Sequence, residues 1–262
     1  MPNSVVLPEV FLNRPLAHRA FHSEDKPENS LAAIRAAMEA GYGIEIDIQP
    51  SRDGTPMVFH DYDLERLTGT YGDITKTSDV TLAELRLPGG IEPIPTLKQV
   101  LSLVAGLVPI LIEVKDQDGA LGKQVGLLEK QIAALLAPYP GPVAVMSFNP
   151  HSVAALADLL PDIPRGLTTC AFDPVSWDTV PASRREELIG IPDFDRVAAS
   201  FVSHDKTDLT STHVTRIKQT APVLTWTIRS PEEEATARRI ADNVTFETYP
   251  APLDPPQEIP NS

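Results

Sequence analysis

Short apolar runs alternate with longer amphipathic runs along most of the chain. This alternation is typical of parallel α/β proteins, in which a helix follows each buried strand and packs on the sheet. The predicted strands are residues 15–18, 43–48, 56–59, 110–114, 142–146, 164–167, 197–201, 223–227 and 244–246. The predicted helices are residues 28–40, 96–104, 121–136, 153–160, 213–218 and 232–240. A (β/α)8 barrel uses about 250 residues, so the 262-residue chain is predicted to be one barrel domain over residues 1–262.

The nine predicted strands are one more than the barrel needs. Too few residues separate 43–48 from 56–59 for a crossover helix, which predicts either a hairpin or an irregular barrel segment. Residues 61–95 are rich in Thr, Asp, Gly and Pro and have weak periodicity, and they predict a small cap inserted after the third strand, with one short helix near 82–85. The proline-rich residues 250–262 are predicted to lie on the surface without regular structure.

Composition argues against several classes of protein. The formal net charge is −14, from 22 Lys and Arg against 36 Asp and Glu. No basic patch is visible that could bind nucleic acid or an anionic membrane. The single cysteine, Cys170, excludes an intramolecular disulfide and a cysteine zinc cluster, and we expect it in the core. Residues 1–10 lack the pattern of a secretory signal, and no apolar run reaches the roughly 18 residues of a membrane span. We therefore expect a cytoplasmic protein.

The segment Ile44-Glu45-Ile46-Asp47-Ile48 carries two carboxylates on one predicted strand. Strand alternation places Glu45 and Asp47 on one face and the isoleucines on the other. Two carboxylates that face a barrel interior need a neutralising cation, and Mg²⁺ and Ca²⁺ prefer carboxylate oxygens. The alternative is the solvent-exposed face of an edge strand. The pattern favours a metal site.

The segment Leu111-Ile112-Glu113-Val114-Lys115 repeats this arrangement. Glu113 and Lys115 share one face of the strand. Alone, such a pair indicates an ordinary ion pair. Beside Glu45 and Asp47, it offers a third carboxylate and a cation for a phosphate oxygen.

Two histidines lie where predicted strands end, His18 and His60. Histidine titrates in the range that suits a general base and a general acid, which phosphodiester hydrolysis requires. Arg19 can bind a non-bridging phosphate oxygen, and His22 lies near but has no identifiable partner. Trp226, at another strand end, suits the wall of a substrate pocket or the core equally. The remaining histidines are expected to be structural or on the surface: His151, His204 and His213.

These segments together resemble the glycerophosphodiester phosphodiesterase family, from about residue 16 to residue 250. The N-terminal segments are His18-Arg19-Ala20, Pro27-Glu28-Asn29-Ser30, Glu45-Ile46-Asp47 and Asp53-Gly54-Thr55-Pro56-Met57-Val58-Phe59-His60-Asp61. The later segments are Leu64-Glu65-Arg66-Leu67-Thr68-Gly69, Ile94-Pro95-Thr96-Leu97, Glu113-Val114-Lys115, Ser147-Phe148 and Trp226-Thr227. The ordered His-Arg, Glu-x-Asp and His-Asp elements are specific only in combination.

The resemblance implies a (β/α)8 barrel with an inserted cap. It implies one divalent cation, Mg²⁺ or Ca²⁺, bound by Glu45, Asp47 and Glu113. It implies that His18 and His60 are the acid and base. It places Arg19 and Lys115 on the phosphate. Trp226 is our further candidate for substrate binding. In family members that cleave next to glycerol, the glycerol 2-hydroxyl is thought to attack phosphorus first, and water then opens the cyclic phosphate.

Two departures leave the substrate open. Ala20 stands where the family usually has glycine, and Phe246-Glu247-Thr248 stands where it often has Thr-Asp. The leading hypothesis is hydrolysis of a small glycerophosphodiester to an alcohol and glycerol 3-phosphate, in glycerol and lipid metabolism. The runner-up is a lysophospholipid or another phosphodiester, which an apolar cap pocket would favour. The cap has few large hydrophobic residues.

Two other classes fit the sequence less well. A different metal-dependent barrel enzyme, such as a sugar isomerase or an amidohydrolase, needs metal-binding histidines that are absent here. A non-catalytic binding protein on this fold would not need the full residue set. The sequence does not determine the oligomeric state, and a homo-oligomer is compatible with it.

Overall fold

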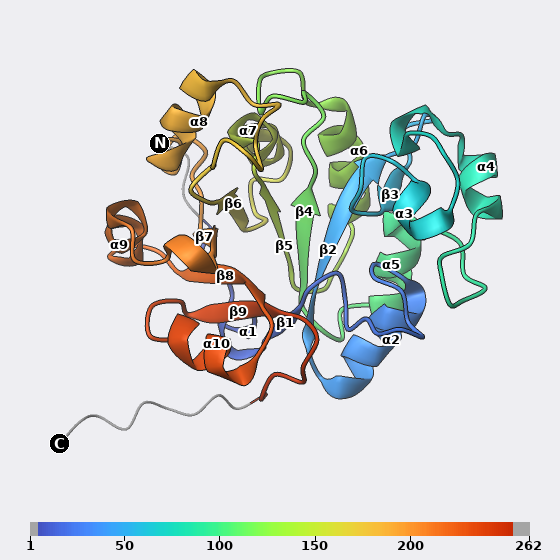
Figure 1. The fold of residues 1–262 in the computed structure, drawn as a ribbon, viewed down its shortest axis with the longest axis horizontal. Coiled ribbons are helices and arrows are strands. Elements are labelled where there is room, and N and C mark those ends of the chain that lie inside the picture. Colours follow the sequence, from blue (N-terminus) through green and yellow to red (C-terminus); the bar gives the residue numbers. More distant parts are fainter. Residues whose placement is uncertain (1–4, 254–262) are drawn as a thin grey trace.

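Eight parallel strands close into a barrel in the computed structural model of the protein, which describes residues 5–253 (Figure 1). The strands are β1 Leu16–Ala17, β2 Gly43–Pro50, β4 Ile110–Val114, β5 Val143–Ser147, β6 Arg165–Thr169, β7 Phe201–Asp205, β8 Val223–Ile228 and β9 Asn243–Phe246. The barrel closes at β1, which pairs in parallel with both β2 and β9. The predicted barrel is confirmed. The predicted strand that the barrel does not need, residues 56–59, is β3 Pro56–Val58, which forms an antiparallel hairpin with β2.

Helices follow most of the strands and surround the barrel (Figure 1). They are α2 Leu31–Ala40, α5 Leu97–Val104, α6 Leu127–Leu136, α7 Pro150–Leu159, α8 Ala182–Ile189, α9 Thr212–Lys218 and α10 Pro231–Ala237. Local sequence sets several helix starts. Thr96 and Gln99 form a capping box at α5, and Ser30 caps α2. Helix α2 begins later than predicted because Asn29 has a φ of 58°, which is not helical.

Several predicted bounds were wrong. The strand predicted at residues 197–201 is β7, Phe201–Asp205, because Phe201 is the first residue paired with β6, opposite Gly166. The apolar run before it is buried without strand pairing. Helix α6 begins at Leu127, six residues later than predicted. Carboxylates of Asp116 and Asp118 accept backbone N–H bonds from the preceding loop and hold it out of a helix. Helix α8 and the short helix α1, Val10–Asn13, were not predicted.

One end of the barrel is filled with apolar side chains. Leu16, Leu111, Ala144, Met146, Phe201 and Leu224 pack there with Leu7 and Phe11 from the N-terminal segment. Phe11 is fully buried, which contributes about 2–3 kcal/mol. Helix α1 is held by Asn243, whose Nδ2 donates to the carbonyls of Phe11 and Arg14. This packing leaves the opposite end, where the strands finish, for polar side chains.

The predicted cap is built around its own small core. Its helices are α3 Glu65–Thr68, η1 Ile74–Lys76 and α4 Asp79–Glu84, where the sequence predicted only one. Their apolar residues pack on β3 in one cluster: Met57, Phe59, Leu64, Leu67, Ile74, Leu82, Leu87 and Ile94. The cap therefore has a core of its own, although Tyr71, Val80 and Ile91 are exposed on its surface.

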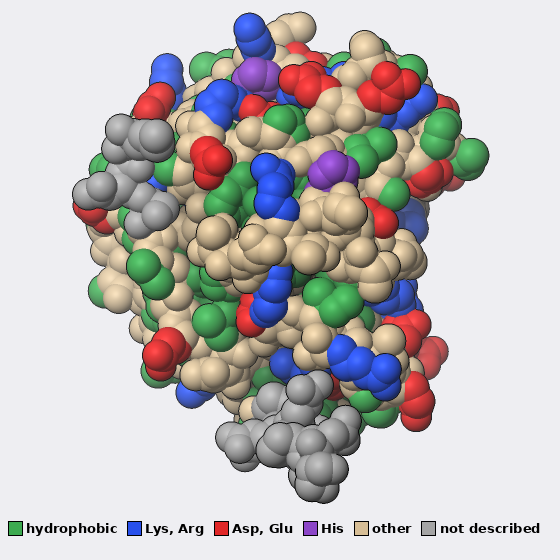
Figure 2. Space-filling view, turned by 90° about the vertical axis from the view of Figure 1, so that its left-hand side faces the viewer, with side chains coloured by type: hydrophobic (Ala, Val, Ile, Leu, Met, Phe, Trp, Pro, Cys, Tyr) green, Lys and Arg blue, Asp and Glu red, His purple; other side chains and the backbone are tan. Residues whose placement is uncertain are grey.

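At the C-terminal end, residues 250–253 have no regular structure, as predicted. Ala251 is nevertheless buried, and its carbonyl accepts a bond from the Tyr42 hydroxyl. The rest of the predicted tail, residues 254–262, lies outside the described residues. Acidic and basic side chains are interspersed on the face shown in Figure 2. Within residues 5–253, every helix is too short or too polar to cross a membrane.

Candidate active site

Three carboxylates meet inside the barrel at the end where the strands finish. Glu45 and Asp47 lie on β2, and Glu113 lies on the adjacent β4 directly opposite Asp47 in the strand register. One oxygen from each lies within 4.8 Å of the others, and all three side chains are buried. The isoleucines between them pack outward in the main core, so the predicted alternation is confirmed.

The pKa values of Glu45 and Asp47 are shifted in opposite directions. Burial, together with the charges of Asp47 and Glu113, raises the pKa of Glu45 well above its usual value. Asp47 is also buried, but the basic groups around it, His60, Lys115 and Arg19, hold its pKa below the usual range. Three converging carboxylate oxygens are the donors that a hard divalent cation prefers. The residues present fit such a cation.

Basic and amide groups surround the carboxylates. Lys115 Nζ donates to Glu113 Oε1 at 2.9 Å and lies 3.7 Å from Asp47 Oδ1. Arg19 Nε lies 3.6 Å from Asp47 Oδ2, and Asn29 Nδ2 donates to the same oxygen at 3.0 Å. These groups offset part of the negative charge.

The β1 loop takes a left-handed turn to reach the cluster. Arg19 and Ala20 have φ values of 50° and 67°, and the Arg19 N–H donates to Glu45 Oε2 at 3.0 Å. A left-handed conformation costs a non-glycine residue about 1–2 kcal/mol. Ala20 therefore keeps the turn that a glycine would favour, at the cost of local strain.

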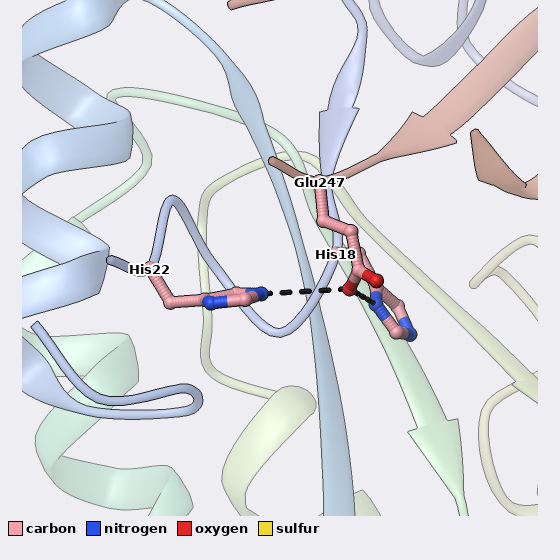
Figure 3. Close-up of side chains that lie close together, drawn as sticks. All are labelled: His18, His22 and Glu247. Atoms are coloured by element: carbon pink, nitrogen blue, oxygen red, sulfur yellow. Dashed lines mark hydrogen bonds and ion pairs between the residues drawn. The ribbon is translucent and has the colours of Figure 1, made fainter. Parts of the chain in front are cut away.

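His18 is held by a carboxylate from the far end of the chain. Its Nδ1 lies 2.5 Å from Glu247 Oε2, and His22 Nε2 lies 3.5 Å from the same oxygen (Figure 3). Arg229 Nε donates to the other oxygen of Glu247 at 2.7 Å. Burial lowers the pKa of His18, although the bond to Glu247 opposes this shift. The pKa of Glu247 is held low, against the effect of burial, by its bonds to both histidines.

His60 has an equivalent arrangement. Its Nδ1 lies 2.7 Å from Asp61 Oδ1, and Arg66 donates to both Asp61 oxygens. Arg66 also binds Glu28, which accepts a bond from Arg19 at 2.8 Å. Each histidine therefore presents Nδ1 to a carboxylate that an arginine also binds. This contact fixes the orientation of each ring, and Nε2 is the nitrogen that the carboxylate does not bind.

A cavity of about 190 Å³, here called the carboxylate cavity, brings together all eight sequence-predicted site residues. They are His18, Arg19, Glu45, Asp47, His60, Glu113, Lys115 and Trp226. Trp226 is both a cavity wall and part of an aromatic group, because its ring lies 5.7 Å from that of Phe148 and its Nε1 donates to the Ser203 carbonyl. Both alternatives for Trp226, the wall of a pocket and a place in the core packing, therefore apply.

Sequence reasoning missed Glu247, Arg229 and the role of His22. The available signal was the Phe246-Glu247-Thr248 departure, where a carboxylate follows the last strand. A second group of possible metal ligands comprises His18, His22 and Glu247. Because Glu247 is already bound by Arg229 and His18, we interpret this group as a hydrogen-bond network.

The other singled-out residues lie elsewhere. His204 is buried and bonds Thr169 Oγ1 at 2.7 Å, as a structural histidine does. His151 and His213 do not line the carboxylate cavity. Cys170 lies in an apolar cluster, and burial raises its pKa to about 12. It is the core residue that the sequence predicted.

The sequence is similar to one family of known proteins. The sequence model of the "Glycerophosphoryl diester phosphodiesterase family" matches residues 18–243. A glycerophosphodiester phosphodiesterase of Caldanaerobacter subterraneus is 34% identical over 163 residues, which cover 58% of this chain and 65% of that protein. The match therefore spans slightly less than two thirds of this relative.

Solved structures share the fold. A phosphodiesterase of Oleispira antarctica, in complex with the product sn-glycerol-3-phosphate, superposes with a TM-score of 0.76 at 24% identity, covering 92% of this chain and 96% of that one. A glycerophosphodiester phosphodiesterase of Thermotoga maritima superposes with a TM-score of 0.66 at 21% identity, covering 88% and 92%.

Proposed function

Because the chain belongs to the glycerophosphoryl diester phosphodiesterase family, we propose that it hydrolyses glycerophosphodiesters to an alcohol and glycerol 3-phosphate. One observation carries the proposal. Two histidines, each held at Nδ1 by a carboxylate, border one cavity with three converging carboxylates. This combination offers two proton-transfer groups beside a site for a divalent cation.

Glu45, Asp47 and Glu113 would hold one divalent cation, Mg²⁺ or Ca²⁺. When bound, the cation supplies positive charge that polarises the phosphate and stabilises the charge that develops during reaction. Asn29 fixes one of these ligands through its bond to Asp47. Lys115 fixes another through Glu113.

His18 and His60 would transfer the protons. With Nδ1–H directed to Glu247, neutral His18 carries a lone pair on Nε2, and His60 is oriented in the same way by Asp61. One histidine takes the proton of the attacking hydroxyl, and the other gives a proton to the departing alkoxide. The proposed attacking group is the glycerol 2-hydroxyl, which forms a cyclic phosphate that water then opens.

Arg19 and Lys115 would bind the non-bridging phosphate oxygens. Both line the carboxylate cavity, and the buried Nε of Arg19 has no hydrogen-bond partner within residues 5–253. Such a donor is available for a phosphate oxygen. Trp226 forms a wall beside it. The cytoplasmic location and the single domain stay predictions.

The test is release of glycerol 3-phosphate from glycerophosphocholine, with lysophosphatidylcholine assayed in parallel. We expect turnover of the first. His18→Ala and His60→Ala should each reduce the rate by about 10²–10⁴-fold and leave metal binding unchanged. His213→Ala, outside the cavity, is the control. Turnover of lysophosphatidylcholine alone would support the runner-up substrate, and full activity in both histidine variants would refute the acid and base roles.

A further inference from the structure

A second and larger cavity adjoins the carboxylate cavity. This annex cavity has a volume of about 490 Å³. His60, Glu113, Lys115 and Phe148 border both cavities. A diester whose phosphate lies at the carboxylates therefore has room for one substituent in each cavity.

The annex cavity has a mainly apolar lining. Its side chains include Tyr62, Leu121, Phe148, Trp177 and Val180. The rings of Phe148 and Trp177 lie 4.8 Å apart, and Leu121 and Val180 are buried in the cluster that supports them. Only Tyr62 comes from the cap. The apolar surface thus comes mainly from the segments that follow β4, β5 and β6, which the sequence did not indicate.

The charged groups on its wall are already paired. The Asp116 carboxylate accepts backbone N–H bonds from Gly119 and Leu121 and a side-chain bond from Asn149. Glu113 belongs to the carboxylate cluster and is bound by Lys115. The wall therefore offers aromatic and aliphatic surface but no unengaged carboxylate for a cationic group.

The carboxylate cavity is more polar, although Met146, Phe148 and Trp226 also line it. Besides the site residues, its wall includes the polar side chains of Thr227, Arg229 and Thr245. It suits the hydroxyl groups of a glycerol phosphate. We propose that the annex cavity binds the leaving alcohol of the diester and selects alcohols that carry an uncharged apolar group. This inference rests on the proposed function.

The test compares three glycerol 3-phosphate diesters: the choline ester, the 3,3-dimethylbutyl ester and the ethyl ester. The first two have the same shape and differ in charge, and the third is too small to fill the annex cavity. We expect the dimethylbutyl ester to have a kcat/KM about 10-fold or more above those of the other two. It exceeds the ethyl ester because a few methyl groups that fill a pocket produce differences of this size. It exceeds the choline ester because burial of the trimethylammonium group beside Lys115, without a free carboxylate, is unfavourable.

Two variants locate the effect. Trp177→Ala removes part of the wall, and Thr179→Trp adds a large side chain to the cavity from an exposed position. Each should lower kcat/KM for the dimethylbutyl ester by about 10-fold and leave the ethyl ester within about 2-fold. Tyr71→Ala, an exposed cap aromatic outside the lining, is the matched control and should change neither.

The outcomes separate the inference from the function on which it rests. Equal or greater kcat/KM for the choline ester, or unchanged selectivity in both variants, would overturn the annex assignment while the function stands. Failure to hydrolyse all three esters would overturn the function and the inference together.

Discussion

His18 Nδ1 and Glu247 Oε2 lie 2.5 Å apart, although the residues are separated by 229 positions in sequence. β1 and β9 are adjacent in the closed barrel, so the segments that follow them meet at its open end. Arg229 binds the same carboxylate, which keeps a negative charge beside the imidazole. Glu247 is therefore expected to orient His18 without touching the substrate.

Replacing Glu247 with Gln should reduce kcat by about 10²-fold with little change in KM or in metal binding, because the histidine loses its orienting charge. Steady-state kinetics and metal titration would measure this. Glu247→Asp should recover part of the rate. Glu232→Gln, on the exposed side of α10, is the control. A KM effect without loss of kcat would contradict the positioning role.

The pH profile should show the shifted His18. Burial and the charge of Arg19 lower its pKa below 6.5, while Glu247 and Asp47 oppose the shift. If His18 must be neutral, kcat/KM should stay high at pH 6.5 and fall only at lower pH, as His18 is protonated. Removing Glu247 removes an influence that raises the pKa, so the fall should move to still lower pH in Glu247→Gln. A shift to higher pH would contradict the assignment.

Chelation should abolish activity reversibly. Without a cation, Glu45, Asp47 and Glu113 repel one another, and the substrate phosphate loses its positive partner. Addition of Mg²⁺ or Ca²⁺ should restore turnover, and the better cation identifies the preferred metal. Asp47→Asn should weaken metal binding by more than about 100-fold, measured by calorimetry. Glu186→Gln, exposed on α8, should bind normally.

Gly166→Ala should destabilise the barrel. An added Cβ would lie 2.3 Å from the buried ring of Phe201, where β6 and β7 pair. Such overpacking costs about 1–3 kcal/mol, measurable by denaturant unfolding. Gly90→Ala, whose Cβ would meet nothing nearer than 3.9 Å, should leave the free energy of unfolding nearly unchanged. Equal stability of the two variants would show that Phe201 repacks freely.

The sequence by itself determined the fold class and named the candidate site residues. Its alternation of apolar and amphipathic runs predicted the barrel, and period two along β2 placed Glu45 and Asp47 on one face. These are local properties, because side-chain direction in a strand depends only on position. The sequence was less reliable for the bounds of β7 and α6. Apolar character continues into the turns before these elements, and their first residues are defined by long-range strand pairing and by loop carboxylates.

Only the tertiary structure decided which residues meet. It placed Glu113 opposite Asp47 through the register of β2 and β4. It brought Glu247 to His18 through barrel closure, and it placed Trp177 and Tyr62 on one cavity. These contacts join segments far apart in the chain. They depend on strand pairing and loop packing, which no local period in the sequence encodes.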